Sequence, residues 1–302
     1  MTPKGRAEWY LFATTFIWGG TFVIVKVGLN DVSPFLMVAL RFSLAALLLL
    51  PFCLRPLARL DRPLLWTGFR LGFLIFLGFI FQTAGLNDTT ASKSAFITSM
   101  MVVFTPFFQM ILLKKRPRRH HLIGVALVSV GLWFLTAPSG GGFNRGDLLT
   151  LLCAIVFGLY LVALDIASRR HEILPLTFVQ MLAPALYSWG ALPFFERPFL
   201  IPTGSVFFAL GYTAILATVV TGYIQTRYQR DTTPTRAALI FSIEPLWAAI
   251  LGFLFLGEAL GAWGILGGAL ILGGILFSEL SDVMGARLKK RWAPAPSDSS
   301  LK

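Results

Sequence analysis

One acidic residue stands in the middle of an apolar segment. Residues 232–256 are almost wholly apolar and long enough to cross the ~30 Å hydrocarbon core of a bilayer, yet Glu244 and Pro245 lie near their centre. A carboxylate at this depth costs at least ~2.5 kcal/mol and normally faces a bundle interior or a wet cavity, and Pro removes a helix hydrogen bond. The pair predicts a substrate or proton site. The alternative is a structural carboxylate that pairs with a neighbouring Arg.

Further polar and aromatic side chains in apolar segments are candidates for the same site. Arg41 lies two turns inside its segment and can either bind a carboxylate or extend to the membrane surface. Gln82 and Gln225 need hydrogen-bond partners in lipid, and a hydrogen bond to another helix is the ordinary solution. Large rings can line a cavity, and the rings that we expect there are Trp18, Phe157, Tyr160 and Trp247. Together with Glu244, these are the predicted substrate-binding residues.

The residue pattern gives little support to enzyme chemistry. His120, His121 and His171 lie at the edges of loops, so they form no haem pair or zinc triad at membrane depth. The only cysteines, Cys53 and Cys153, suggest neither a disulfide framework nor a metal cluster. No phosphate-binding-loop motif occurs. We therefore expect a protein that is not an enzyme and that has no metal and no cofactor.

The composition indicates a membrane protein with little soluble mass. Hydrophobic residues make up 56% and charged residues 13%, with a mean hydropathy of +0.75, whereas soluble domains are about 45–50% apolar and about 25% charged. The net charge of +12 comes mostly from short loops between apolar segments, which is a signal of membrane topology. We expect the lipid bilayer and a small-molecule substrate as partners, and no nucleic acid.

Ten apolar segments are candidate membrane spans: 9–29, 34–54, 64–86, 90–113, 120–137, 147–168, 173–194, 204–226, 232–256 and 261–281. We expect the first to stay uncleaved, because no signal-peptidase site follows it. A Gly-rich linker, 138–146, separates a first unit at 1–137 from a second at 147–281. A basic and then disordered tail is expected at 282–302.

The two units are related by one constant offset in residue number, which is 143. Identical or similar pairs at this offset are Gln82/Gln225, Lys93/Arg236, Ser99/Ser242, Gly124/Gly267 and Gly131/Gly274. So many matches at one offset indicate a duplication. Pro106 and Pro245 miss this offset slightly, which predicts helix breaks that differ by about one turn. Lys93 and Arg236 are expected near opposite membrane faces, as parts of a gate or as anchors at the lipid headgroups.

The basic residues predict the orientation of the chain. If the N-terminus is cytoplasmic, 20 of the 26 Lys and Arg residues lie in inside segments and four in outside segments, so both termini are expected in the cytoplasm. An odd number of spans per unit then inverts the second copy. The predicted fold class is an all-α membrane protein with ten transmembrane helices as two inverted five-helix repeats. Such repeats are typical of transporters, which alternate access around a central site.

Six motifs extend this picture: Trp18-Gly-Gly-Thr-Phe-Val-Ile-Val-Lys26, Leu40-Arg-Phe42, Thr89-Thr-Ala-Ser-Lys-Ser-Ala-Phe-Ile97, Ile243-Glu-Pro-Leu-Trp-Ala-Ala249, Leu256-Gly-Glu258 and Gly267-Gly-Ala-Leu-Ile-Leu-Gly-Gly274. Together they resemble the EamA-type branch of the drug/metabolite transporter superfamily, from Trp9 to about Leu280. The resemblance implies two EamA repeats, a bacterial inner-membrane location, and export of amino acids or other small metabolites. The loop at 114–121 departs from the pattern, because it lacks the Gly-Glu pair of the second copy.

We therefore expect a multi-pass secondary transporter of the inner membrane that exports small metabolites such as amino acids. Protons are a candidate coupling ion, with Glu244 as the group that exchanges them. One chain contains both halves of the pathway, so a monomer is the expected state. The alternatives are a lipid-carrier flippase, a nucleotide-sugar-type carrier or, from another class, a membrane-embedded transferase, which would need a reactive cluster at a membrane surface.

Overall fold

The computed structural model of the chain describes residues 3–57, 61–114, 119–136 and 143–291. Within these ranges the regular structure is helical, apart from one isolated bridge between Val32 and Leu200. The helices are α1 Pro3–Gly28, α2 Pro34–Leu57, α3 Arg62–Asp88, α4 Ala91–Thr98, α5 Met101–Leu113, α6 Arg119–Thr136, α7 Arg145–Ser168, α8 Ile173–Phe195, α9 Gly204–Gly211, η1 Tyr212–Val220, α10 Thr221–Tyr228, η2 Gln229–Asp231, α11 Pro234–Phe241, α12 Glu244–Leu256 and α13 Ala262–Arg291.

Each of the ten expected spans coincides with a helix or with a broken helix, and the chain is an all-α membrane protein. Among the described residues, seven of the ten are long and apolar enough to cross a bilayer. The broken helices α4–α5, α9–α10 and α11–α12 each count as one. The others are α8, which packs against α2 and α3, and the mutually packed pair α6 and α13. Helix α13 continues to Arg291, past the expected end at residue 281. Residues 138–142 of the expected linker and the tail from 292 lie outside the described ranges.

The two helices that break inside the bundle do so at the same place in the repeat. Helix α4 gives way to α5 at Ser99, and α11 gives way to α12 at Ser242, its equivalent in the second copy. Each Ser donates its hydroxyl to the carbonyl three residues earlier, at 2.6 and 2.7 Å, and such local bonds compete with the helix. The expectation that the breaks differ by one turn is wrong. Pro106 lies inside α5, where lipid-embedded helices tolerate Pro.

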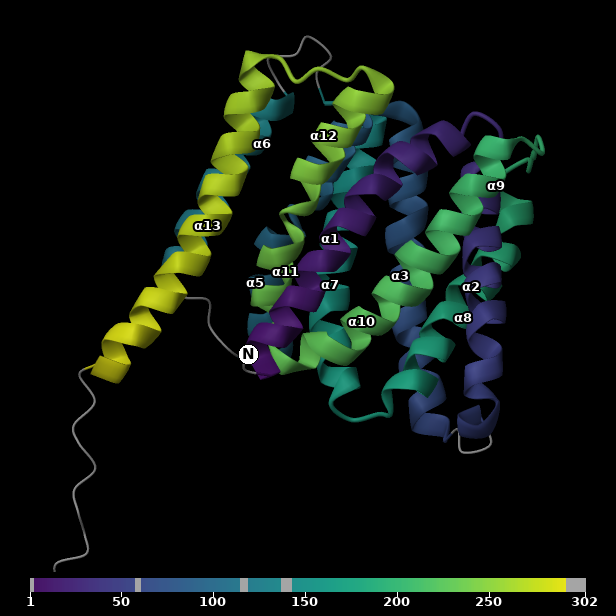
Figure 1. Cartoon of the computed structure of the whole chain (residues 1–302), viewed down its shortest axis with the longest axis horizontal. Coiled ribbons are helices and arrows are strands. Elements are labelled where there is room, and N and C mark those ends of the chain that lie inside the picture. Colours follow the sequence, from purple (N-terminus) through teal and green to yellow (C-terminus); the bar gives the residue numbers. More distant parts are fainter. Residues whose placement is uncertain (1–2, 58–60, 115–118, 137–142, 292–302) are drawn as a thin grey trace, which may run out of the picture.

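The two copies are inverted relative to each other. Helix α1 ends beside the end of α3, where Lys26 donates to the carbonyl of Leu86 at 2.7 Å. Helix α7 begins at that same end of α3, where Asn144 donates to the carbonyl of Asp88 at 3.0 Å. The first helices of the two copies therefore run in opposite directions, as can be followed in Figure 1.

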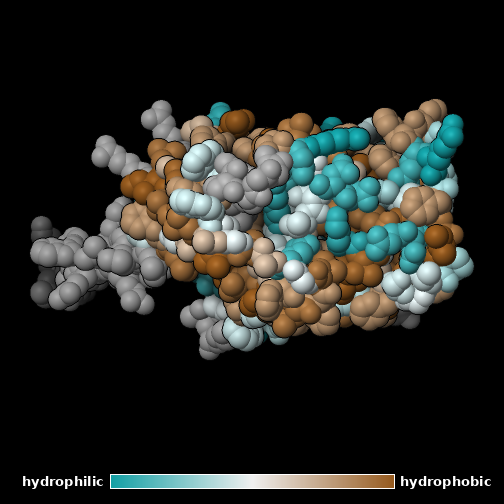
Figure 2. Space-filling view, turned by 90° about the horizontal axis from the view of Figure 1, so that it is seen from above, coloured by the Kyte–Doolittle hydropathy of each residue, from teal (hydrophilic) through white to brown (hydrophobic). Residues whose placement is uncertain are grey.

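The bundle has two ends, each defined by the helix termini that meet there. The Asp147 face contains the ends of α1 and α3 and the starts of α4 and α7. The Glu8 face contains the start of α1, the end of α7 and the start of α11. Figure 2 views the first of these ends and shows hydrophilic residues gathered over the body, with hydrophobic atoms around them. This distribution fits a polar membrane surface above an apolar, lipid-embedded wall.

Candidate functional site

A cavity lies in the interior of the bundle, among helices from both copies. Its lining comprises Trp18, Thr21, Phe42, Ile75, Phe79, Gln82, Thr98, Met101, Phe157, Tyr160, Leu161, Met181, Ala217, Thr218, Thr221, Gly222, Gln225, Phe241 and Glu244. The cavity has a volume of about 80 Å³. Sites for small molecules usually measure about 300–1,000 Å³. The cavity is therefore smaller than a usual small-molecule site.

The lining follows the internal repeat. Twelve of its residues form six pairs at the offset of 143: Trp18/Leu161, Ile75/Thr218, Phe79/Gly222, Gln82/Gln225, Thr98/Phe241 and Met101/Glu244. Equivalent positions of inverted copies meet only around the axis that relates the copies. The cavity therefore lies where the two halves face each other, which is where transporters built from inverted repeats hold their substrates.

Glu244 is the acidic member of this lining. It is 8% exposed and is the first residue of α12, directly after the break that follows α11. The positive end of a helix dipole favours a negative charge at this position. Among the described residues, no hydrogen bond or ion pair engages its carboxylate, and no other lining residue is charged. The equivalent position in the first copy is Met101, so the duplication leaves the charge on one side of the cavity.

Arg41 lies behind the wall of the cavity and not in its lining. The side chain is 4% exposed, and it donates to the Thr218 hydroxyl at 2.7 Å and to the Ala217 carbonyl at 3.1 Å. Its guanidinium carbon also lies 4.2 Å from the centre of the Phe79 ring. Thr218, Ala217 and Phe79 all line the cavity. Arg41 therefore supports the wall. The sequence allowed an ion pair between Glu244 and a neighbouring Arg, but Arg41 does not form it.

Trp18 reaches the same part of the wall from α1. Its indole nitrogen donates to the Ala217 carbonyl at 3.2 Å and to the Thr221 hydroxyl at 3.0 Å. Ala217 belongs to η1, a stretch of π-helix. Such stretches are rare and are often found at functional sites. The carbonyl of Ala217 thus accepts hydrogen bonds from two other helices, which ties α1 and α2 to η1 beside the cavity.

The predicted residues Gln82, Gln225 and Tyr160 line the cavity, and their side chains form hydrogen bonds within the protein. Gln82 donates to the Thr98 hydroxyl at 3.4 Å, and Gln225 donates to Gln229 at 3.2 Å. The Tyr160 hydroxyl donates to the Gln180 side chain at 3.3 Å. These amides therefore have hydrogen-bond partners in the protein, as is usual in apolar helices.

Two of the eight predicted residues, Arg41 and Trp247, lie outside the lining. Trp247 donates to the Thr15 hydroxyl at 3.2 Å and packs against Gly19 and Phe16, between α12 and α1. The lining also includes residues that the sequence did not single out, among them Met101. The offset of the repeat could have found Met101 from Glu244, because equivalent positions of inverted copies meet around one axis.

A helical membrane protein with a cavity between two inverted copies of a five-helix unit has the architecture of a membrane transporter. The chain belongs to the EamA-like transporter family, whose model matches it twice, over residues 5–137 and 144–280. The family and the names of the relatives indicate a transporter rather than an enzyme.

Several relatives carry transporter names without a stated substrate. An uncharacterized transporter of Archaeoglobus fulgidus is 36% identical over 274 residues, which cover 91% of this chain and 86% of the relative. The uncharacterized inner membrane transporter YedA of Escherichia coli is 27% identical and covers 96% and 95% of the two chains. One solved crystal structure superposes with a TM-score of 0.74 over 95% of this chain and 99% of its own, at 20% identity. This likeness shows the fold alone.

Proposed function

We propose that this protein is a secondary transporter of small amphipathic solutes that carry a positively charged group, amino acids among them. The observation that carries the proposal is the lining of the central cavity, which combines aromatic rings with one acidic side chain, Glu244. A carboxylate in an apolar setting is costly unless a cation or a proton neutralises it. The bound solute or a proton would supply that positive charge.

The rings of the lining favour the same class of solute. Six of the lining residues are aromatic: Trp18, Phe42, Phe79, Phe157, Tyr160 and Phe241. Aromatic faces attract ammonium groups, and more strongly where water is excluded. The rings also offer an apolar surface to the body of the solute. An anionic cargo, such as a nucleotide sugar or a lipid diphosphate, would instead meet the carboxylate of Glu244, while the guanidinium of Arg41 is engaged behind the wall.

Transport requires this small cavity to widen toward one face and then toward the other. The two inverted copies provide for this, because a rocking motion that separates them at one face brings them together at the opposite face. We propose that Glu244 binds either the cationic solute or a proton. Proton entry would then release the solute, and the proton gradient of the inner membrane would drive export.

We place the protein in the bacterial inner membrane with both termini in the cytoplasm, so that the Glu8 face is cytoplasmic. The support is the excess of Lys and Arg in the segments of that side. The two copies, 1–137 and 147–281, act as the moving units. One chain contains both, and a monomer is the proposed working unit.

Transport in proteoliposomes with an imposed pH gradient tests the proposal. Glu244→Gln keeps the size of the side chain and removes its charge. We expect cation transport to fall by about 10- to 100-fold, since hydrogen bonds to charged groups contribute about 1.5–3 kcal/mol, and we expect the dependence on pH to disappear. Glu172→Gln, at the exposed start of α8, is the matched control and should transport like the wild type. Unchanged transport and unchanged pH dependence in Glu244→Gln would remove this residue from the mechanism.

A further inference from the structure

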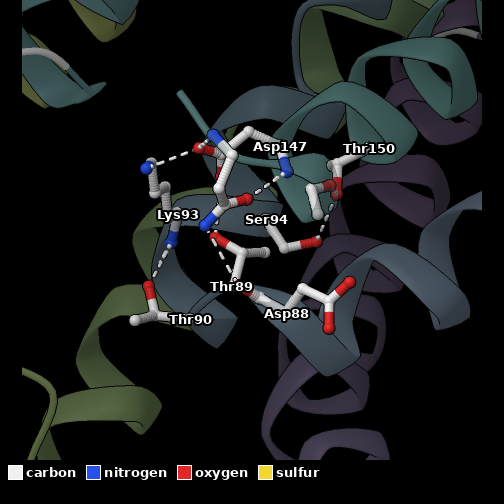
Figure 3. A network of polar contacts seen from close by, with 9 residues as sticks. Asp88, Thr89, Thr90, Lys93, Ser94, Asp147 and Thr150 are labelled. Atoms are coloured by element: carbon white, nitrogen blue, oxygen red, sulfur yellow. Dashed lines mark hydrogen bonds and ion pairs between the residues drawn. The ribbon is translucent and has the colours of Figure 1, made fainter. Parts of the chain in front are cut away.

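An ion pair joins the two copies at the Asp147 face. The ammonium of Lys93, in α4 of the first copy, lies 2.6 Å from the carboxylate of Asp147, in α7 of the second copy. The Asp147 side chain is fully buried, and it also accepts from the Thr89 hydroxyl at 2.8 Å and from the Asn144 backbone at 3.0 Å. Figure 3 shows these groups converging between the two helices. The carboxylate of this ion pair is therefore shielded from water, while the Lys93 side chain is 15% exposed.

A second ion pair joins the copies at the Glu8 face. Arg236, in α11 of the second copy, lies 3.2 Å from the carboxylate of Glu8, in α1 of the first copy. Beside it the ring of Tyr10 stacks on that of Tyr228, with 4.5 Å between the ring centres. This pair is longer than the first. Because Glu8 is 32% exposed, the pair is also more accessible to water.

The two ion pairs are equivalent in the repeat. Lys93 and Arg236 occupy matching positions of the two copies, and each follows by three residues a Thr that caps its helix. Each cation pairs with an acid in the first helix of the other copy. Asp147 matches residue 4, so Glu8 lies one helical turn beyond the equivalent position. The same arrangement of charges thus occurs once at each face of the bundle.

A second pair of contacts repeats in the same way. Lys26 donates to the Thr89 carbonyl at 2.8 Å, and Arg169 donates to the Thr232 carbonyl at 3.3 Å. The donors Lys26 and Arg169 are equivalent at the offset of 143, and so are the acceptors Thr89 and Thr232. Each of these contacts stays within one copy, and each orients the backbone just before the helix that carries Lys93 or Arg236. The contacts within a copy therefore position the cation that reaches across to the other copy.

We propose that Lys93–Asp147 and Arg236–Glu8 are two alternating latches. Each closes the entrance to the cavity at its own face, and each opens when the copies separate there. In the structure both pairs are formed: the more buried Lys93–Asp147 pair at the Asp147 face and the more exposed Arg236–Glu8 pair at the Glu8 face. The inference rests on the proposed transport by alternating access and adds the groups that set the resting conformation. Loss of one latch should expose the cavity to the face on which that latch lies.

Alkylation of a reporter cysteine tests the latches without measuring transport. The reporter is Thr98→Cys in the cavity lining, in a chain without Cys53 and Cys153, reconstituted in vesicles of known orientation and treated with an impermeant maleimide. We expect Lys93→Met and Asp147→Asn to speed alkylation from the Asp147 face by about fivefold or more, a typical coupling between two conformations. Asp147→Asn keeps an oxygen that can cap α7. Arg236→Met should speed alkylation from the Glu8 face only.

Arg227→Met is the matched control, because Arg227 pairs with Asp231 at 3.1 Å within one copy. It should leave the rates at both faces unchanged, and the charge exchange Lys93→Asp with Asp147→Lys should restore the slow rate. Equal acceleration at both faces, or no change in a folded Lys93→Met protein, would overturn the latches. If alkylation shifts as expected but no cationic solute is transported, the latches stand and the proposed function fails.

Discussion

Lys114 and Gly257 occupy equivalent positions of the two copies, at the ends of α5 and α12. Both adopt left-handed backbone, with φ of 54° and 66°, which suits glycine and strains a residue with a Cβ atom. After Gly257 the chain turns so that the Glu258 carboxylate accepts from the backbone nitrogens of Ala91 and Ser92, at 2.8 and 2.9 Å. The Gly-Glu pair of the second copy thus ends one helix and caps the start of another.

Opposite effects on stability are expected from substitutions at these two positions. A Cβ on Gly257 would meet no atom within 4 Å, so Gly257→Ala should cost only the backbone strain, about 1 kcal/mol. Lys114→Gly should relieve a similar strain and raise the melting temperature in detergent. Thermal unfolding of the purified protein, followed by tryptophan fluorescence, measures both. If both variants shift in the same direction, the left-handed backbone is not the cause.

At the scale of the elements, α3 and α7 cross at a contact between two glycines. A Cβ on Gly85 would lie 2.7 Å from the Gly146 carbonyl oxygen, and one on Gly146 would lie 2.5 Å from the Gly85 carbonyl oxygen. Small residues let helix backbones approach this closely in lipid. The crossing places Asp147, the next residue along α7, beside α4 and within reach of Lys93.

Gly85→Ala should separate α3 from α7 and destabilise the protein by about 1–3 kcal/mol, as overpacking does in a close-packed interior. The matched control is Gly190→Ala in α8, where a Cβ would meet no atom within 4 Å and where Ala favours the helix by about 0.5–1 kcal/mol. Unfolding midpoints of the two variants in the same detergent give the comparison. A midpoint for Gly85→Ala at or above the wild type would show that the crossing can relax.

At the scale of the whole molecule, the distribution of basic residues sets the proposed orientation. Most of the Lys and Arg residues of both copies belong to segments of the Glu8 face. The wider hollow at the Asp147 face, of about 550 Å³, is lined by residues that include Lys26, Lys93 and Glu258. On the proposed orientation, this hollow opens to the periplasm.

Single exposed positions report the orientation directly. Asn30 follows α1 at the Asp147 face, and Glu172 precedes α8 at the Glu8 face. In a chain without other cysteines, an impermeant maleimide should label Asn30→Cys in intact spheroplasts and Glu172→Cys only in inside-out vesicles. The charge asymmetry is the physical reason, since segments rich in Lys and Arg remain in the cytoplasm. The reverse labelling pattern would contradict the proposed orientation.

The linear sequence was sufficient to predict the helical spans and the duplication, but it singled out only six of the 19 residues that line the cavity. Hydropathy acts on each segment separately, and an odd number of spans makes inversion of the second copy unavoidable. Gln82, Gln225 and Glu244 were predicted at the site because a polar group in an apolar helix needs a protected environment. The same reasoning misplaced the helix breaks, because it relied on proline and overlooked the hydroxyls of Ser99 and Ser242.

The tertiary structure alone decided which way the remaining side chains point. The rotation of a helix about its axis depends on packing against helices that are distant in the sequence, so Arg41 and Trp247 lie outside the lining although both occupy apolar helices. The same packing placed both Met101 and Glu244 in the lining and brought Lys93 to Asp147 across the two copies. The local sequence determines which segments enter the membrane, but contacts between copies determine which charges meet, because those contacts form only after the spans assemble.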